Sequence, residues 1–225
     1  MTYILHIDTS AENAITAISA DGQVISQRIN QDSRSQASNI NLHINEVLQE
    51  AGIELKDINA ISVIGGPGSY TGLRIGLATA KGICYTLDKA LILYNKLDVL
   101  ALQLYKTGGA RYNHYLTILP ARDKEYFITL YNNNGQQVIE TRHAFETELL
   151  EIIEKEKDGL MVSGVLNKTI VEMLINKHIE FRENELIDQN FWSHMSFEAY
   201  KAGQFADLAN SEPFYLKQVY THTKL

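Results

Sequence analysis

Hydrophobic and polar positions alternate near the start of the chain, and later apolar residues recur at helical spacing. Alternation or short β-rich runs predict strands, whereas apolar side chains three or four positions apart predict helices. The dipeptide Asp21-Gly22 between two such runs is a strong signal for a tight hairpin. The expected strands of the first half are 2–8, 14–20, 23–29, 58–64 and 90–94, and its expected helices are 36–51, 71–87 and 96–106.

The predicted elements of the second half follow nearly the same order as those of the first half. Three strands followed by alternating helices and strands indicate a mixed sheet covered by helices, so two halves predict a duplicated α/β architecture. Thr107-Gly108-Gly109 breaks the pattern, and we therefore expect domains at 1–107 and 108–225. The expected strands here are 114–120, 125–131, 136–142 and 160–164, and the expected helices are 145–156, 167–176 and 195–209.

The charge balance argues against a protein that grips nucleic acid by itself. The chain has 225 residues, 45% of them hydrophobic, and a formal net charge of -7. Residues 1–107 hold 8 basic and 10 acidic residues, and residues 108–225 hold 12 and 17. Binding a phosphate backbone requires clustered lysine and arginine. Any action on nucleic acid therefore needs another protein to supply most of the contact.

The single cysteine and the N-terminus favour a cytoplasmic protein. Cys84 has no partner for an intramolecular disulfide, and its apolar neighbours predict a buried, inert thiol. The first eight residues lack a basic region, and their apolar run is too short for a signal peptide. No apolar stretch approaches the ~18 residues of a membrane span.

The densest candidate motif is the glycine-rich segment that follows the strand at 58–64. The loop Gly65-Gly66-Pro67-Gly68-Ser69-Tyr70 leads into a helix, a context that can hold an anion on free backbone N–H groups. Its spacing matches neither the dinucleotide fingerprint nor the P-loop, because Leu73-Arg74 stand where a P-loop needs Lys and Ser or Thr.

The helix after this loop carries small residues along one face. Gly72, Gly76 and Ala80 recur every four positions, although glycine inside a helix costs about 1 kcal/mol relative to alanine. Close packing against the chain's own sheet explains this face, and close packing against a partner's helix explains it equally well. Leu73 and Leu77 add an apolar stripe in either case.

Asp8-Thr9-Ser10 is a second candidate, because it follows the first strand. An aspartate and two hydroxyls in a tight turn suit a metal-bound phosphate, but taken alone they are better explained by local hydrogen bonds that satisfy the turn. No two of the seven histidines have the spacing that would place two metal ligands on one helix face. No Gly-x-Ser-x-Gly elbow is present, since the glycines around Ser69 stand at other positions.

Several motifs together resemble one known family. Ile7-Asp8-Thr9-Ser10, the run from Gly66 to Gly76, and Ala80-Lys81-Gly82 are similar to the bacterial dimerization subunits of tRNA threonylcarbamoyladenosine synthesis, the TsaB/YeaZ family. Glu212-Pro213-Phe214-Tyr215-Leu216-Lys217 also fits the family pattern. The resemblance covers nearly the whole chain and is strongest over its first hundred residues.

The resemblance implies the duplicated actin/sugar-kinase/Hsp70-type (ASKHA) fold and a non-catalytic role. Members pair through N-terminal helices with the catalytic threonylcarbamoyltransferase paralogue, or with themselves when alone, and a small ATPase joins the pair. The complex modifies the adenosine beside the anticodon of ANN-decoding tRNAs, so this chain would meet tRNA indirectly. ATP and Mg²⁺ would belong to the partner subunits, and the chain itself would hold no cofactor or metal. The residues expected at the partner interface are Ile40, Ile44, Tyr70, Thr71, Gly72, Leu73, Gly76, Leu77 and Ala80.

Departures from the family pattern favour a scaffold over an enzyme. Many members carry a histidine near the first helix, where this chain has Arg34-Ser35-Gln36-Ala37 and only His43 nearby. Pro120-Ala121-Arg122 replaces the usual Asp-Ala-Arg. Two other hypotheses remain. One is a nucleotide-dependent transferase or kinase of the same fold in which Asp8, Thr9 and Ser10 hold phosphate, whereas in the scaffold these residues would be a vestigial phosphate loop. The other is a secreted or proteolytic factor.

Overall fold

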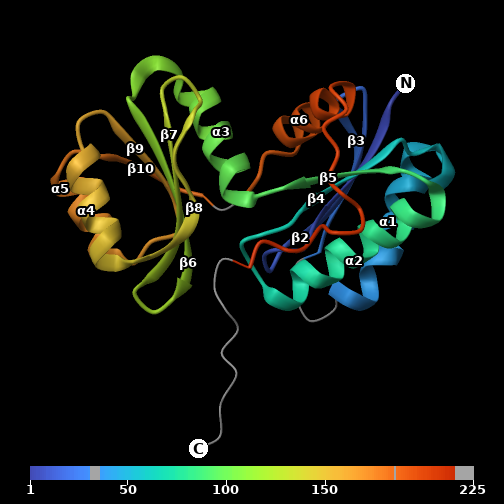
Figure 1. The fold of residues 1–225 in the computed structure, drawn as a ribbon, viewed down its shortest axis with the longest axis horizontal. Helices are drawn as coiled ribbons and strands as arrows, with labels where there is room; N and C mark the ends of the chain where they lie inside the picture. Colours follow the sequence, from blue (N-terminus) through green and yellow to red (C-terminus); the bar gives the residue numbers. More distant parts are fainter. Residues whose placement is uncertain (31–35, 185, 216–225) are drawn as a thin grey trace, which may run out of the picture. The chain divides into compact units, whose positions relative to one another are not determined.

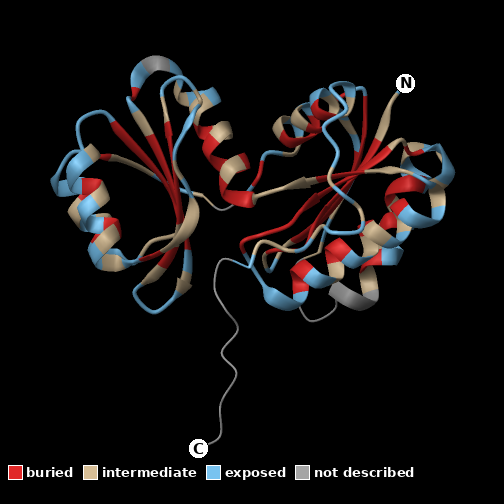
Figure 2. Ribbon diagram, viewed as in Figure 1, coloured by how far each residue is buried: buried red, intermediate tan, exposed pale blue. Residues whose placement is uncertain are grey.

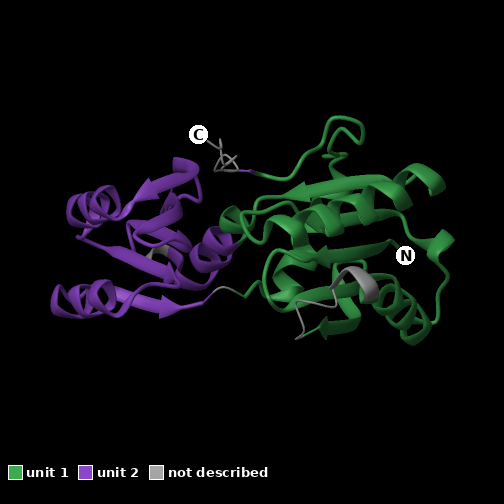
Figure 3. Cartoon of the chain, turned by 90° about the horizontal axis from the view of Figure 1, so that it is seen from below, with its two compact units in different colours: residues 1–99, 186–214 green, residues 100–185, 215–225 purple. Residues whose placement is uncertain are grey.

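The computed structural model describes residues 1–30, 36–184 and 186–215. The chain forms two compact units, each built on its own five-stranded sheet. Unit 1 comprises residues 1–99 and 186–214, and unit 2 comprises 100–185 and 215–225 (Figure 3). Each unit therefore has its own core and is described separately below.

The sheet of unit 1 has the strand order β3-β2-β1-β4-β5. The first three strands pair antiparallel, whereas β1, β4 and β5 run parallel. Asp21 and Gly22, at φ 47° and 83°, form the expected hairpin turn, since a tight turn of this kind needs positive φ at both positions. The strands are β1 Tyr3–Asp8, β2 Ala14–Ala20, β3 Gln23–Asn30, β4 Ala60–Ile64 and β5 Ala90–Tyr94.

Helices cover both faces of this sheet (Figure 1). Helices α1 (Gln36–Ala51) and α2 (Tyr70–Leu87) pack on one face, where they share a buried cluster with inward residues of β1 and β4. Helix α6 (Gln189–Lys201) packs on the other face, where Ala199 contacts Ile4 and Ile92. A short 3₁₀ turn at Leu55–Asp57 leads from α1 towards β4. The buried strands lie between these helix layers (Figure 2).

Unit 2 repeats this arrangement with the strand order β10-β9-β6-β7-β8. Its strands β6, β7 and β8 are antiparallel, and β9 and β10 run parallel to β6. Leu149 and Ile153 of helix α4 and Ile170 and Leu174 of helix α5 pack on one face of the sheet. The elements are β6 His114–Arg122, β7 Glu125–Asn132, β8 Gln137–Phe145, α4 Glu146–Glu156, β9 Leu160–Gly164, α5 Lys168–Asn176 and β10 Glu180–Glu183.

The last helix of each half packs on the sheet of the other half. Helix α3 (Lys96–Gly108) belongs to the first half, but its Ala101 and Leu104 pack against Tyr115 and Met161 in unit 2. Helix α6 comes from the second half and covers the sheet of unit 1. The units therefore differ from the division at 107/108 that the sequence indicated, because burial of these helices decides where they belong.

The predicted order of elements is confirmed, with two differences near the C-terminus. The short strand β10 was not predicted, and the helix expected at 195–209 instead spans Gln189–Lys201. Asp188 caps this helix by accepting a hydrogen bond from the backbone N–H of Phe191. Gly203, at φ 66°, provides the left-handed residue that typically ends a helix. Among the described helices, none is long and apolar enough to cross a membrane.

Candidate functional site

Three segments meet at the carboxyl edge of the parallel strands in unit 1. β1 ends at Asp8, β4 leads into the glycine loop, and Lys96 follows β5. Because these strands are parallel, their carboxyl ends lie at the same edge of the sheet. Open α/β sheets bind ligands at this edge, so it is the natural place to look for a phosphate site.

The loop Asp8-Thr9-Ser10 is buried and bonded inside the protein. Its three residues are 2%, 2% and 3% exposed. The Asp8 Oδ1 atom accepts a hydrogen bond from the Ser10 backbone N–H at 2.8 Å. The Thr9 hydroxyl donates to the backbone carbonyl of Gly72 at 2.7 Å. This is the turn-type bonding that the sequence left open as one of two explanations.

Lys96 completes this buried cluster, and the sequence alone did not single it out. Its Nζ atom donates to the Ser10 hydroxyl at 3.0 Å and lies 3.9 Å from the Asp8 Oδ2 atom. The Lys96 and Asp8 side chains are only 4% and 3% exposed. Burying two charges is costly unless they are paired and hydrogen-bonded, and here each charge compensates the other.

The cluster is arranged unlike an open phosphate site. An incoming phosphate would have to displace the Lys96–Ser10 hydrogen bond and enter a loop that solvent does not reach. Within the ranges 1–30, 36–184 and 186–215, no group of three His, Cys, Asp or Glu side chains could hold a metal ion.

The one histidine on β1, His6, lies buried beneath α6. Its Nε2 atom is 2.8 Å from the Ser19 hydroxyl, and its ring makes an edge contact with Trp192. Burial lowers the pKa of His6 to about 3, because the charged imidazolium loses its hydration. His6 is therefore neutral at physiological pH.

The glycine motif is explained by close packing inside unit 1. A Cβ atom at Gly68 would lie 2.2 Å from the Ser10 carbonyl oxygen, and the Ser69 backbone N–H donates to that same oxygen at 2.7 Å. A Cβ atom at Gly76 would lie 2.3 Å from the Thr9 hydroxyl oxygen. These glycines allow the start of α2 to pack directly on the loop after β1.

Gly65 serves a different segment, residues 206–214, which we call the C-terminal strap. The strap begins where the Ala206 N–H donates to the Leu91 carbonyl and ends where the Phe214 N–H donates to the Gly65 carbonyl, both at 2.8 Å. A Cβ atom at Gly65 would lie 2.7 Å from a methyl group of Leu93 on β5 and 3.0 Å from the Phe214 ring. The first glycine of the motif therefore leaves room for the strap.

Lys81 of the Ala80-Lys81-Gly82 motif also holds the C-terminal strap. Its Nζ atom donates to the backbone carbonyls of Ala209 and Ser211 at 3.1 and 3.0 Å. The strap forms its own turn around Asp207, which accepts from the backbone N–H of Ala209. Motif residues that looked like candidates for chemistry thus tie together segments far apart in the sequence.

Most residues expected at the partner interface lie inside unit 1. Tyr70 and Thr71 are exposed at the start of α2. Gly76 packs on Thr9, so the small residue at this position is explained by packing within the chain rather than against a partner's helix. A partner cannot reach the buried members of the set, so the predicted interface is corrected by removing them. The buried members are Ile40, Ile44, Gly72, Leu73, Gly76, Leu77 and Ala80.

The outward face of α2 carries a different set of side chains. Ala78 and Gly82 are exposed small residues one helical turn apart, and Tyr85 is 83% exposed. At the start of this face the Arg74 guanidinium lies 4.2 Å from the centre of the Tyr70 ring. Within the part of the chain that the structure describes, a Cβ atom at Gly82 would meet nothing within 4 Å, so packing among these residues gives no reason for a glycine there.

Cys84 has the character expected from the sequence. It is a free, buried thiol, and burial raises its pKa to about 12. A thiol with this pKa carries almost no thiolate at neutral pH, which agrees with the buried, inert thiol that the sequence indicated.

The fold places the chain among proteins of the actin-like class. Two solved structures from Pseudomonas aeruginosa are similar over nearly the whole chain. One is described as a protein with similarity to peptidase YEAZ (TM-score 0.76, 20% identity, covering 96% of this chain and 100% of that one). The other is YeaZ itself (TM-score 0.71, 21% identity, covering 94% and 100%). A Bacteroides thetaiotaomicron protein with an actin-like ATPase fold is more distant (TM-score 0.52, 11% identity, covering 87% and 96%).

The sequence comparisons then give the family. Residues 23–186 match the family profile described as TsaD, tRNA N6-adenosine threonylcarbamoyltransferase. The Bacillus subtilis tRNA threonylcarbamoyladenosine biosynthesis protein TsaB is 30% identical over 69% of this chain and 67% of its own length. The Escherichia coli protein of that name is 30% identical over 64% and 60%. The chain belongs to the TsaB/YeaZ family of tRNA threonylcarbamoyladenosine biosynthesis proteins.

The catalytic relatives match over a shorter part. A Clostridium perfringens tRNA N6-adenosine threonylcarbamoyltransferase is 34% identical over 42% of this chain, and the match spans 33% of the enzyme. The resemblance predicted from the sequence is thus confirmed for family and fold.

Two helical glycines provide a matched pair that tests the packing of α2. Gly76→Ala should lower the free energy of unfolding by about 1–3 kcal/mol, because its methyl group would overlap the Thr9 hydroxyl. Gly82→Ala should raise it by about 0.5–1 kcal/mol, because open space surrounds that position. Urea unfolding followed by circular dichroism measures both. Equal effects of the two substitutions would contradict the close approach.

The buried Lys96 should matter for stability through Asp8. Lys96→Met leaves the Asp8 carboxylate buried without its cation and should cost about 3–5 kcal/mol. Adding Asp8→Asn should recover part of that loss, since the uncompensated charge is then gone. Lys106→Met, at an exposed lysine on α3, serves as the control. Additive effects in the double variant, measured by urea unfolding, would exclude coupling of the two side chains.

Proposed function

We propose that this chain is the non-catalytic partner subunit of a tRNA threonylcarbamoyladenosine-synthesis complex. In this proposal the threonylcarbamoyltransferase paralogue is the catalytic partner, and a small ATPase joins the pair. The complex installs threonylcarbamoyl on the adenosine beside the anticodon of ANN-decoding tRNAs. Family membership supports a role in this pathway. The buried cluster of Asp8, Ser10 and Lys96 at the carboxyl edge of unit 1 supports the non-catalytic role.

The observation that carries the non-catalytic role is the pairing of Lys96 with Asp8 and Ser10. The strand edge where related folds hold a ligand is here stabilised by the chain's own ammonium group. An enzyme would need this edge open to its substrate. ATP and Mg²⁺ are then properties of the partner subunits, and the acidic chain leaves most of the tRNA contact to them.

The proposed docking surface is the outward face of α1 and α2. On α2 it includes Tyr70, Ala78, Gly82 and Tyr85, and on α1 it includes Leu42, which is 54% exposed. Small residues at Ala78 and Gly82 permit close approach of another helix, and exposed Tyr side chains suit an interface core. Without the paralogue, the same face would pair two copies of this chain.

Blocking this face should prevent docking without unfolding the chain. Ala78→Trp places a bulky side chain on the outward face and should weaken association with the transferase paralogue about tenfold or more. Size-exclusion chromatography and calorimetry of the mixed proteins measure the loss. Ala202→Trp, at an exposed alanine beside α6, is the matched control. An unchanged heterodimer with Ala78→Trp would refute the docking surface.

The second candidate function, a nucleotide-dependent transferase or kinase, rests on the position of Asp8-Thr9-Ser10 at the strand edge. Calorimetry with Mg-ATP on the isolated chain distinguishes it from the proposed function. We expect no micromolar binding and no turnover, because the loop is buried and occupied by its own hydrogen bonds. Micromolar binding with turnover would replace the scaffold proposal with an enzyme.

A further inference from the structure

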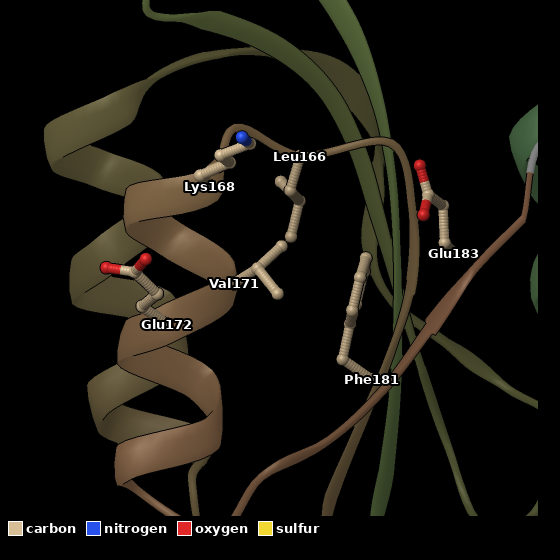
Figure 4. Close-up of a pocket in the computed structure, with 6 residues that line it drawn as sticks. All are labelled: Leu166, Lys168, Val171, Glu172, Phe181 and Glu183. Carbon is tan, nitrogen blue, oxygen red and sulfur yellow. The ribbon is translucent and has the colours of Figure 1, made fainter.

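Unit 2 contains a groove whose lining residues all belong to that unit, and it shares no residue with the cluster at Asp8 or with the outward face of α2. The groove has a volume of about 450 Å³ and lies beside α5 and β10 (Figure 4). Apolar side chains and charged side chains both contribute to it. Its lining residues are Leu166, Lys168, Val171, Glu172, Phe181 and Glu183.

One wall of the groove is the edge of a sheet. Strand β10 is the terminal strand in the order β10-β9-β6-β7-β8, and within the described residues it pairs only with β9. An edge strand presents backbone N–H and C=O groups to which an extended peptide can add by main-chain hydrogen bonds. The groove therefore combines a backbone template with side-chain walls.

The register of β10 determines which side chains an added strand would meet. Phe181 and Glu183 are two residues apart, so both lie on the same face of the strand, and both line the groove. A strand added at this edge would place one side chain beside Phe181 and another, two positions along, beside Glu183. The first position faces the apolar part, formed with Leu166 and Val171.

Charge specifies the second position. Glu183 on β10 and Glu172 on α5 are exposed carboxylates that line the groove, and only Lys168 carries the opposite sign there. A lysine or arginine of the added strand would lie beside Glu183, where opposite charges across strands are favourable. The groove thus matches an aliphatic residue and a basic residue separated by one position.

We propose that this groove binds an extended segment of another protein, which adds to β10 as a sixth strand. The segment carries a branched aliphatic residue next to Phe181 and a lysine or arginine next to Glu183. The inference goes beyond the proposed partner role of the helices and does not depend on it, because every residue involved lies in unit 2.

The test uses the full chain labelled with ¹⁵N and the synthetic probe acetyl-Thr-Lys-Thr-Val-Thr-Lys-Thr-amide. This heptapeptide has a basic residue two positions from valine on each side, so it fits β10 in either direction. Titration should shift amide resonances of β10 and α5, with saturation at millimolar peptide or below. A peptide with both lysines replaced by glutamate should bind roughly fivefold more weakly.

Variants of the chain distinguish binding in the proposed register from nonspecific binding. Glu183→Lys should reverse the preference, so that the glutamate peptide binds more tightly than the lysine peptide. Val171→Glu should abolish the shifts by placing a charge in the apolar part of the groove. Glu151→Lys, at an exposed glutamate on α4 of the same unit, changes the net charge equally and should leave the preference unchanged.

Three results would overturn the proposal. The first is an absence of shifts in β10 and α5 at millimolar probe, or shifts located elsewhere. The second is equal binding of the lysine and glutamate peptides, which would indicate an unspecific apolar surface. The third is the appearance of the same shifts when the free chain is concentrated, which would make a second copy the occupant. None of these readouts uses the transferase paralogue, so failure here leaves the docking of α2 unaffected.

Discussion

The close approach of α2 to the loop after β1 is the constraint on which unit 1 depends. Gly68 and Gly76 permit it, since a Cβ atom at either position would overlap Ser10 or Thr9. The Thr9 hydroxyl is then near enough to donate to Gly72, and Ser10 is held where Lys96 can donate to it. A helix one or two ångströms farther away would open the strand edge and leave buried polar groups unpaired.

A glycine-rich motif before a helix can either bind an anion or allow close packing, and this close approach indicates which of the two applies here. Glycines before a helix suggest an anion cradle, yet most of the motif here serves packing within the chain. Gly65 leaves room for Phe214 of the strap, and Lys81 binds the strap's carbonyl groups. Gly82 is the exception, because no described residue lies within 4 Å of a Cβ atom built there, and it faces outward on the proposed docking surface.

Much of the fold could be predicted from local signals, whereas the candidate site could not. The hairpin at Asp21-Gly22 and the alternation of β1 depend on neighbouring residues, which the sequence displays directly. The bond between Lys96 and Ser10 joins positions 86 residues apart, and no spacing rule reveals such a contact. Periodicity likewise identified the small-residue face of α2, but not whether that face turns inward. The short β10, with four residues and three charges, has too weak a pattern to be recognised.

The exchange of terminal helices has a consequence for how the chain is synthesised. From β6 to β10, unit 2 is continuous in sequence, and its covering helix α3 directly precedes it. Unit 1 instead requires α6 and the strap, which are made after β10. Domains fold as units while the ribosome extends the chain. The elements β6 to β10 are therefore all made while the sheet of unit 1 still has one face without its covering helix α6.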